Sequence, residues 1–263
     1  MTHEPDAGAH HNSPGGHSES GHSHYYPIDF PIGEGKTDYE KYLRTVELLT
    51  LQKPDSEAVS PDELLFQVTH QASELWMKQM LHEIDRAVAA MKAMQLEQAC
   101  RSFRLIAEIQ MLLTHQVDML GRHLSIWEYG KIRTALGQGS GMESPGFNRL
   151  LKTPKPIWDA FSEVIASQNI SLNTLYRDYT QHLNLHALAE CLVTYDDLFH
   201  KWRTHHMDLV CRTIGLDSNS LKGIPTKVLQ RGVLERFFPE LFEIRNQLTN
   251  ESKLAYGGQP LNS

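Results

Sequence analysis

Several features are scarce in this chain of 263 residues, and each absence excludes a class of protein. Lys and Arg are not clustered and the formal net charge is -7, which argues against nucleic acid as a main partner, because phosphate recognition needs concentrated positive charge. No apolar run is long enough to span a bilayer, so no membrane role is expected. The polar N-terminus lacks the apolar core of a signal peptide, and we therefore expect a cytoplasmic protein.

Cysteine is also scarce. The chain has only Cys100, Cys191 and Cys211, an odd number with no C-x-x-C or other metal-binding spacing. This pattern is typical of reduced, structural thiols in a cytosolic protein.

Strand patterns are missing as well, since no run alternates apolar and polar residues with a period of two, and no internal repeat is found. Hydrophobic residues make up 40% of the chain, which is ordinary for a protein with a real core. We therefore predict an all-α fold, a single-domain helical bundle over residues 26–263.

Residues 1–25 have a different composition, with almost nothing apolar, and cannot fold by burial. We predict a disordered tail, with metal scavenging as the alternative, because neutral imidazoles bind Ni, Cu and Zn. The tail histidines are His3, His10, His11, His17, His22 and His24.

Helical periodicity covers most of the remaining chain. The predicted helices span about 39–52, 61–94, 96–120 and 126–136, a short piece near Trp158, a region from 171 that continues into 194–215, and a last region ending FFPELFEIR. Ser60, Pro61 and Glu63 form a capping-box signature for the second helix. Gly121 is predicted to end the third.

The helix at 194–215 carries two adjacent histidines on different faces. His206 falls on the apolar stripe with Trp202, whereas His205 falls on the charged stripe. A buried imidazole needs a hydrogen-bond partner, a metal or a proton-transfer role. From the pattern alone, a core histidine that binds a backbone carbonyl stays an open alternative to a functional one.

Two further residue patterns are candidates for a site. Phe66 and His70 lie one helical turn apart on one edge of the second helix, which suits a pocket wall but also ordinary packing. Arg133 precedes the flexible GQGSG loop at 137–141. That loop lacks the Lys-Ser/Thr pair of a P-loop and does not predict nucleotide binding.

Three separated stretches, HQASELWMKQMLHE from His70, EYGKIRTALGQGSG from Glu128, and WRTHHMDLVCRTIG from Trp202 with FFPELFEIR from Phe237, resemble the tryptophan 2,3-dioxygenase family over about residues 39–248. The resemblance implies an all-α fold with a haem b pocket between long helices. It also implies that His206 is the proximal ligand of the haem iron. A single imidazole ligand leaves the opposite face of the iron free for O₂.

The resemblance also implies roles for residues around the pocket. His70 matches the catalytic distal histidine that faces the indole N–H, and Arg133 matches the clamp for the substrate carboxylate, a task that suits the planar guanidinium fork. The other matched positions are Phe66 and Tyr129 on the pocket wall, Ser140 and Gly141 at the haem edge, and Tyr39, Tyr42 and Leu43 on a helix that completes a neighbouring subunit's pocket in an intertwined homotetramer.

Three departures from the family pattern concern the substrate. The glycine-rich loop that follows the proximal histidine helix is replaced by LDSNSLKGIP, with Ser220 near the place of the family's threonine. Met-Glu-Ser follows Gly141 where the family has Phe-Gln-Ser, and the segment between Ser144 and His182 is shorter.

We therefore expect a haem-dependent oxygenase that cleaves the C2–C3 bond of L-tryptophan to give N-formylkynurenine, as in tryptophan catabolism by the kynurenine pathway. One alternative is a monooxygenase of secondary metabolism that makes a 2-oxindole or a hydroxylated aromatic amino acid. Another is a non-catalytic haem-binding sensor.

Overall fold

The computed structural model describes residues 35–219, 223, 225 and 232–255, in two compact units, Met1–Leu51 and Gln52–Ser263. The predicted His-rich tail, residues 1–25, lies outside the described residues. The predicted domain boundary at residue 26 therefore stays a prediction.

The first unit carries two short helices instead of the single helix that the pattern predicted. α1 (Asp38–Leu43) begins with a capping box, in which Thr37 Oγ1 accepts from the Glu40 N–H and the Glu40 carboxylate accepts from the Thr37 N–H. Arg44 then adopts a left-handed conformation, with φ of 53°, before α2 (Thr45–Leu48). The predicted helix is broken because a left-handed residue cannot continue an α-helix.

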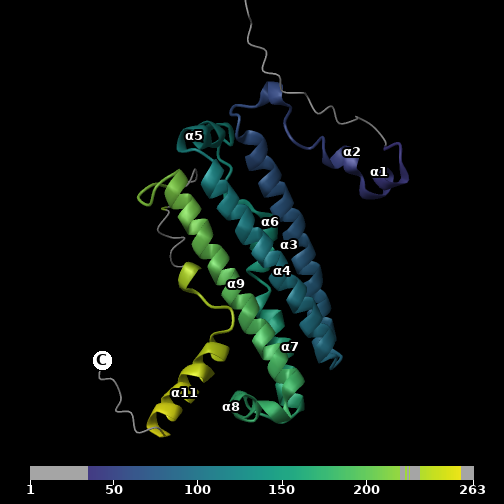
Figure 1. Cartoon of the computed structure of the whole chain (residues 1–263), viewed down its shortest axis with the longest axis vertical. Helices are drawn as coiled ribbons and strands as arrows, with labels where there is room; N and C mark the ends of the chain where they lie inside the picture. The colour runs from purple at the N-terminus through teal and green to yellow at the C-terminus, as the bar shows by residue number, and fades with distance from the viewer. Residues whose placement is uncertain (1–34, 220–222, 224, 226–231, 256–263) are drawn as a thin grey trace, which may run out of the picture. The chain divides into compact units, whose positions relative to one another are not determined.

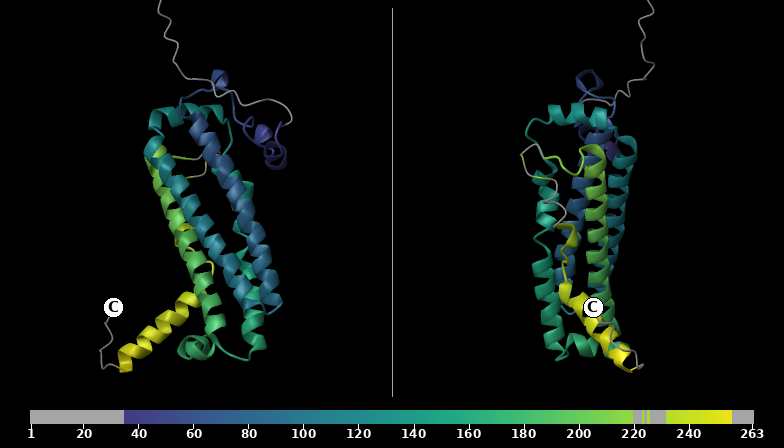
Figure 2. Two further views of the ribbon diagram at one scale, coloured as in Figure 1. Left: turned by 45° about the vertical axis from the view of Figure 1, so that its right-hand side comes forward. Right: turned by 90° about the vertical axis from the view of Figure 1, so that its left-hand side faces the viewer.

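Three long helices form the frame of the second unit: α3 (Glu63–Lys92), α4 (Leu96–His123) and α9 (Leu183–Thr213). α4 packs along both α3 and α9 (Figure 1), and the three helices run side by side in the turned views (Figure 2). Among the residues that the structure describes no strand occurs, only an isolated bridge. The predicted all-α fold is confirmed. Over the same residues, none of the helices has the length and apolar character needed to cross a membrane.

The start of α3 lies two residues beyond the predicted position, at Glu63. The Ser60 Oγ accepts a hydrogen bond from the Asp62 N–H, and the buried Glu63 carboxylate accepts one from the Val59 N–H at 2.7 Å. The predicted capping box was therefore wrong. The Ser60 and Glu63 side chains instead stabilise the turn before the helix, since Glu63 binds the N–H of Val59 and not that of Ser60.

The end of α4 also differs from the prediction. The helix runs through Gly121 to His123. A Cβ atom at Gly121 would lie 3.8 Å from a Leu209 methyl group of α9. Packing against α9 covers this turn, so tertiary contact outweighs the weak local preference of glycine for a helix end.

Shorter elements connect the long helices, and two of them, α6 and α7, pack on α3. In chain order they are η1 (Asp55–Glu57), α5 (Ile126–Ala135), η2 (Gly141–Glu143), α6 (Pro145–Leu150), α7 (Pro154–Ser167), α8 (Leu172–Arg177) and η3 (Tyr179–Gln181). The helix predicted near Trp158 is present as α7, but the expectation of a single helix in this region was wrong, because α6 also forms and both helices have Pro in the first turn. Proline begins a helix there without losing an intrahelical hydrogen bond.

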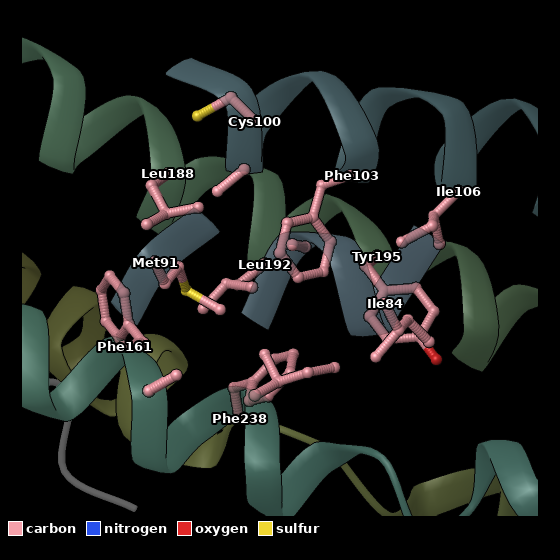
Figure 3. Packing of buried hydrophobic residues seen from close by; sticks show 14 of the residues in the cluster. Ile84, Met91, Cys100, Phe103, Ile106, Phe161, Leu188, Leu192, Tyr195 and Phe238 are labelled. Carbon is pink, nitrogen blue, oxygen red and sulfur yellow. The ribbon is translucent and has the colours of Figure 1, made fainter. Parts of the chain in front are cut away.

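The last helix, α11 (Pro239–Ala255), begins inside the FFPELFEIR motif and runs past it, so the predicted helix end was wrong. Phe238, which precedes the helix, is completely buried. It belongs to the apolar core between α3, α4, α7 and α9, with Phe103, Phe161 and Tyr195 among its largest members (Figure 3).

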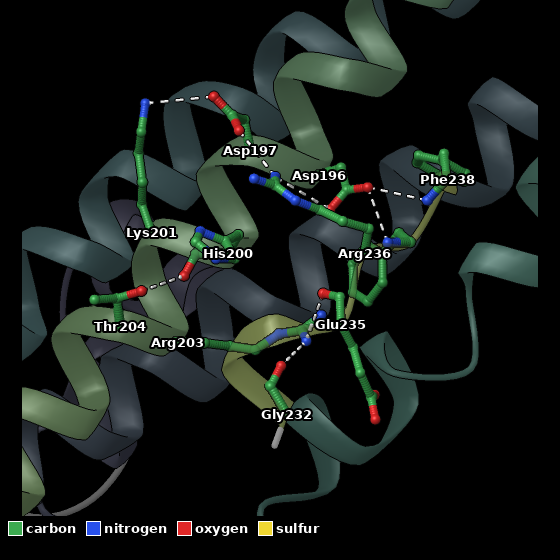
Figure 4. Close-up of polar contacts among 11 residues, drawn as sticks. Asp196, Asp197, His200, Lys201, Arg203, Thr204, Gly232, Glu235, Arg236 and Phe238 are labelled. Carbon is green, nitrogen blue, oxygen red and sulfur yellow. Dashed lines mark hydrogen bonds and ion pairs between the residues drawn. The ribbon is translucent and has the colours of Figure 1, made fainter. Parts of the chain in front are cut away.

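A polar cluster holds the segment before α11 on α9 (Figure 4). The buried Asp196 carboxylate accepts a hydrogen bond from the Phe238 N–H at 2.9 Å. Arg203 donates to the backbone carbonyl oxygens of Gly232 and Glu235. The same helix that carries His206 therefore also anchors the C-terminal segment.

Candidate active site

His206 lies on α9 in a partly buried position, with its ring stacked on that of Trp202. The ring centroids are 5.4 Å apart and the ring planes differ by 14°. Burial disfavours the charged imidazolium, and the charge of His70 adds to this effect, so the pKa of His206 falls to about 4. No hydrogen bond to either ring nitrogen occurs within the described part of the chain. The side chain is a neutral imidazole that can act as a ligand.

The neighbouring His205 has a different environment. Its Nδ1 lies 2.6 Å from Oδ1 of Asp118 on α4, and its side chain is 41% exposed. The two adjacent histidines differ in their contacts, as the helical phase predicted: His205 pairs with an acid, whereas His206 stacks on an indole ring.

His70 lies on α3, one turn after Phe66. The ring centroids of the two residues are 4.1 Å apart, and Nδ1 of His70 lies 2.7 Å from the Phe66 carbonyl oxygen. A carbonyl oxygen can only accept, so Nδ1 carries the proton in the neutral form and Nε2 is left as an acceptor.

The environment of His70 favours this neutral form. The residue is accessible to solvent, yet surrounding protein atoms desolvate it and lower its pKa. The hydrogen bond to Phe66 and the charge of Glu74 oppose the shift without reversing it. At neutral pH, Nε2 of His70 can accept a hydrogen bond from a ligand N–H.

α3 and α9 bring His70 and His206 together from distant parts of the sequence. The charge of His70 contributes to the lowered pKa of His206, and such an interaction weakens with distance. His70 near the start of α3 and His206 near the end of α9 therefore lie at the same end of the three-helix frame and interact electrostatically.

α5 contributes a phenol and a guanidinium. Ser125 caps the helix by accepting a hydrogen bond from the Glu128 N–H at 3.1 Å. The Tyr129 ring lies 6.1 Å from that of Phe66. Burial raises the pKa of Tyr129, and the charge of Arg133 one turn later opposes the rise. The structure thus joins Phe66, Tyr129 and Arg133 in one region with His70.

Arg133 also connects α5 to the segment after α9. Its Nη2 donates a hydrogen bond to the backbone carbonyl oxygen of Asn219 at 2.5 Å. A guanidinium has five N–H donors in a planar fork, so this bond leaves further donors for a carboxylate. Sequence spacing gave no sign of the contact, because α5 and Asn219 meet only in the folded chain.

Ser140 and Gly141 lie at the start of η2. The Ser140 Oγ accepts from the Met142 N–H at 3.3 Å, and the Ser140 N–H donates to the Glu143 carboxylate at 3.0 Å. Among the described residues, no hydrogen bond or ring contact joins Ser140 or Gly141 to the two histidines. Their predicted place at the haem edge stays a prediction.

Glu74 is a residue of this region that sequence reasoning missed. It lies one turn after His70 on α3, and its carboxylate accepts hydrogen bonds from the Ser144 Oγ and from the Gly146 N–H. The four-residue spacing from His70 was the signal that could have identified it.

The structure does not test the remaining predicted site residues. Tyr39, Tyr42 and Leu43 belong to the first unit, where their side chains are exposed. Ser220 lies outside the described residues. The roles predicted for all four stay predictions.

Comparison with known proteins identifies relatives over most of the chain. The family model for tryptophan 2,3-dioxygenase matches residues 30–153. The tryptophan 2,3-dioxygenase of Bacillus thuringiensis subsp. konkukian (strain 97-27) is 30% identical over 260 residues, which cover 80% of this chain and 92% of the relative. The enzyme of the same name from Myxococcus xanthus (strain DK1622) is 28% identical over 266 residues, covering 82% and 91% respectively.

A third relative, the tryptophan 2,3-dioxygenase of Rhodococcus jostii (strain RHA1), is 28% identical over 264 residues, with 81% of this chain and 92% of the relative covered. The residues matched by the family model include α3 and α4 and, with them, His70. The chain belongs to the tryptophan 2,3-dioxygenase family of oxidoreductases.

Proposed function

We propose that this chain is a haem b-dependent dioxygenase that cleaves the C2–C3 bond of L-tryptophan, giving N-formylkynurenine, the reaction that opens tryptophan catabolism. The observation that carries the proposal is the pairing of two neutral imidazoles, His70 from α3 and His206 from α9, beside Arg133 and Tyr129 of α5. One imidazole suits a metal, the other suits an N–H donor, and the guanidinium suits a carboxylate.

The residues present fit a haem. His206 is neutral, and within the described residues its ring nitrogens have no hydrogen-bond partner. Over the same residues no group of three or more His, Cys, Asp or Glu side chains could hold a metal ion unaided. A lone imidazole suits an iron whose other ligands come from a porphyrin. The bound haem would supply the activation of O₂, and His206 would hold its iron.

The other side chains would bind and orient L-tryptophan. His70 Nε2 would accept a hydrogen bond from the indole N–H, because Nδ1 already donates to the Phe66 carbonyl oxygen. Arg133 would bind the substrate carboxylate, and the rings of Phe66 and Tyr129 would line the indole site. Holding the substrate at both ends fixes the C2–C3 bond relative to the haem. Both atoms of O₂ enter the product as that bond breaks.

Residues at the margin of the site belong to the proposal as well. Ser140 and Gly141 would lie at the haem edge, and Ser220 would contact the substrate. Tyr39, Tyr42 and Leu43 would complete the pocket of a neighbouring copy in a homotetramer. Their exposure supports this, because three apolar side chains on so short a segment gain free energy when a partner covers them.

The second candidate is monooxygenation of tryptophan or a relative. The observation that favours it is the departure of LDSNSLKGIP from the family's glycine-rich loop, in a segment that contacts Arg133 through Asn219. A different loop beside the carboxylate clamp would change how the substrate is held.

Turnover of tryptophan under ¹⁸O₂ tests the proposal. We expect a Soret absorption band in the haem-loaded protein and N-formylkynurenine that contains two ¹⁸O atoms. A product with one labelled atom would establish the monooxygenase instead. Binding of haem without any turnover would favour the sensor. A chain that binds no haem would refute all three.

A further inference from the structure

The carboxylate of Glu74 joins α3 to the start of α6. One oxygen, Oε1, accepts a hydrogen bond from the Ser144 Oγ, and the other, Oε2, accepts one from the Gly146 N–H at 2.9 Å. Both oxygens of a single partly buried side chain are therefore used on one short segment, which packs beside α3 (Figure 1). Bonds to a charged acceptor are stronger than bonds between neutral groups.

The backbone at the start of α6 lies very close to α3. A Cβ atom at Gly146 would lie 2.7 Å from Oε2 of Glu74 and 2.8 Å from Cβ of Met77, so only glycine fits. The Ser144 Oγ also accepts from the Phe147 N–H at 3.1 Å and caps α6. The contact with Glu74 and the beginning of α6 thus depend on the same hydroxyl group.

The contact also places Phe147, whose ring packs on the helix that carries His206. Its ring centroid lies 5.2 Å from that of Trp202 and 6.0 Å from that of Phe199, both on α9. The Trp202 ring in turn stacks on His206, with 5.4 Å between the centroids. A continuous series of contacts therefore runs from the helix of His70 to the ring of His206.

We propose that Glu74 is a positioning residue for His206, because its carboxylate fixes α6 on α3 and so fixes the Phe147–Trp202 stack against His206. The consequence for catalysis rests on the proposed function, whereas the contact with α6 is a property of the chain alone. The charge of Glu74 also faces His70 and opposes the desolvation that lowers the pKa of that residue.

Glu74→Gln tests this in the full-length protein. A glutamine in the same place carries no charge and has an NH2 group where one carboxylate oxygen lies, so the Ser144 hydroxyl and the Gly146 N–H no longer each have a charged oxygen acceptor of their own. Asp85→Asn is the matched control, since Asp85 is an exposed acid on the same helix. Ser144→Ala removes one of the two hydrogen bonds and leaves the Glu74 carboxylate in place. Ser144→Thr keeps a hydroxyl group that can cap α6.

The first readout is amide hydrogen exchange of the peptide 140–150 in the haem-free protein. We expect roughly 10-fold faster exchange in Glu74→Gln and Ser144→Ala, because the local opening of α6 becomes easier, and wild-type exchange in Asp85→Asn and Ser144→Thr. Equal protection in all variants would overturn the proposal. So would the same acceleration in Asp85→Asn, since the effect would then be general.

The second readout uses the haem-loaded protein. We expect a changed ferrous absorption spectrum in Glu74→Gln and a kcat lower by about 10-fold, with KM for tryptophan within about 3-fold of wild type, because Arg133 and α5 are untouched. A residue that merely stabilised the fold would lower the melting temperature and leave the spectrum and kcat of the folded enzyme unchanged. That result would overturn the positioning role. If wild type binds no haem, the proposed function fails, and hydrogen exchange still decides whether Glu74 holds α6.

Discussion

The two ends of the three-helix frame differ in the residues that lie between the helices. At the end near the start of α9, which we call the apolar end, Met91, Cys100, Phe161 and Leu188 are buried and need no polar partner. At the opposite end, the histidine end, α3 and α9 present His70 and His206, whose charged forms are disfavoured by desolvation. Burial of apolar side chains contributes to stability at the apolar end, whereas desolvation of imidazoles opposes stability at the histidine end.

This difference supports the proposed location of the active site at the histidine end. Imidazoles in a desolvated region are not the residues that folding alone would select, because apolar side chains of similar volume would pack at lower cost. The polar contacts around them, such as His205 with Asp118 and Arg133 with Asn219, add to the apolar packing at this end. Changes at the two ends should therefore have separable effects on stability and activity.

The largest effect is expected from His206→Ala, which should abolish the native ferrous haem spectrum and all turnover. His205 cannot replace the lost ligand, because it lies about 100° around the helix and pairs with Asp118. Haem titration followed by optical spectroscopy measures this, with His205→Ala as the matched control. A native spectrum in His206→Ala together with its loss in His205→Ala would contradict the assignment.

At the apolar end, Phe161→Ala should lower the free energy of unfolding by about 3–5 kcal/mol, because Phe161 is fully buried and its loss leaves a cavity. Urea unfolding of the haem-free protein measures the change. The control Leu183→Ala, at a site that is 60% exposed, should change stability by no more than about 0.5 kcal/mol. If the folded Phe161→Ala variant lost haem binding as completely as His206→Ala, the two ends would not be separable.

Arg133→Leu should weaken tryptophan binding and catalysis by about 2–5 kcal/mol, since it would remove the cationic partner proposed for the substrate carboxylate. Steady-state kinetics should show a strongly raised KM, and Lys should rescue it poorly because it lacks the planar fork. Lys131→Leu is the control, as that side chain is exposed on the same helix. Unchanged affinity for tryptophan in Arg133→Leu would remove this residue from the site.

The smallest effect is expected from His70→Ala, with kcat/KM lower by roughly 10- to 100-fold, or about 1.5–3 kcal/mol, if His70 only accepts a hydrogen bond from the indole N–H. An obligatory general base would lose about 10²- to 10⁴-fold. His82→Ala, an exposed position on α3, should leave the kinetics unchanged.

A 1-methylated tryptophan sharpens this test, because it has no N–H to donate or remove. Positioning by His70 predicts measurable turnover of the analogue by wild type and a smaller penalty for His70→Ala than with tryptophan. Binding of the analogue without any turnover would instead support the general base.

Local signals in the sequence were sufficient for the existence of the long helices and for the different environments of His205 and His206. Helical phase depends only on a 3.6-residue repeat, so the pattern assigned one histidine to the desolvated face and the other to the hydrated face. The resemblance to the family directed attention to Phe66, His70, Tyr129 and Arg133, and the structure brings these four residues into one region with His206.

Contacts between distant segments required the tertiary structure. Gly121 does not end α4, because α9 packs against that turn, and Ser60 does not cap α3, because Glu63 accepts its hydrogen bond from Val59. No periodic pattern in the sequence predicts the contact of Glu74 with Gly146 or that of Arg133 with Asn219. Periodicity records which face of a helix is buried, whereas the partner on that face depends on how the helices pack.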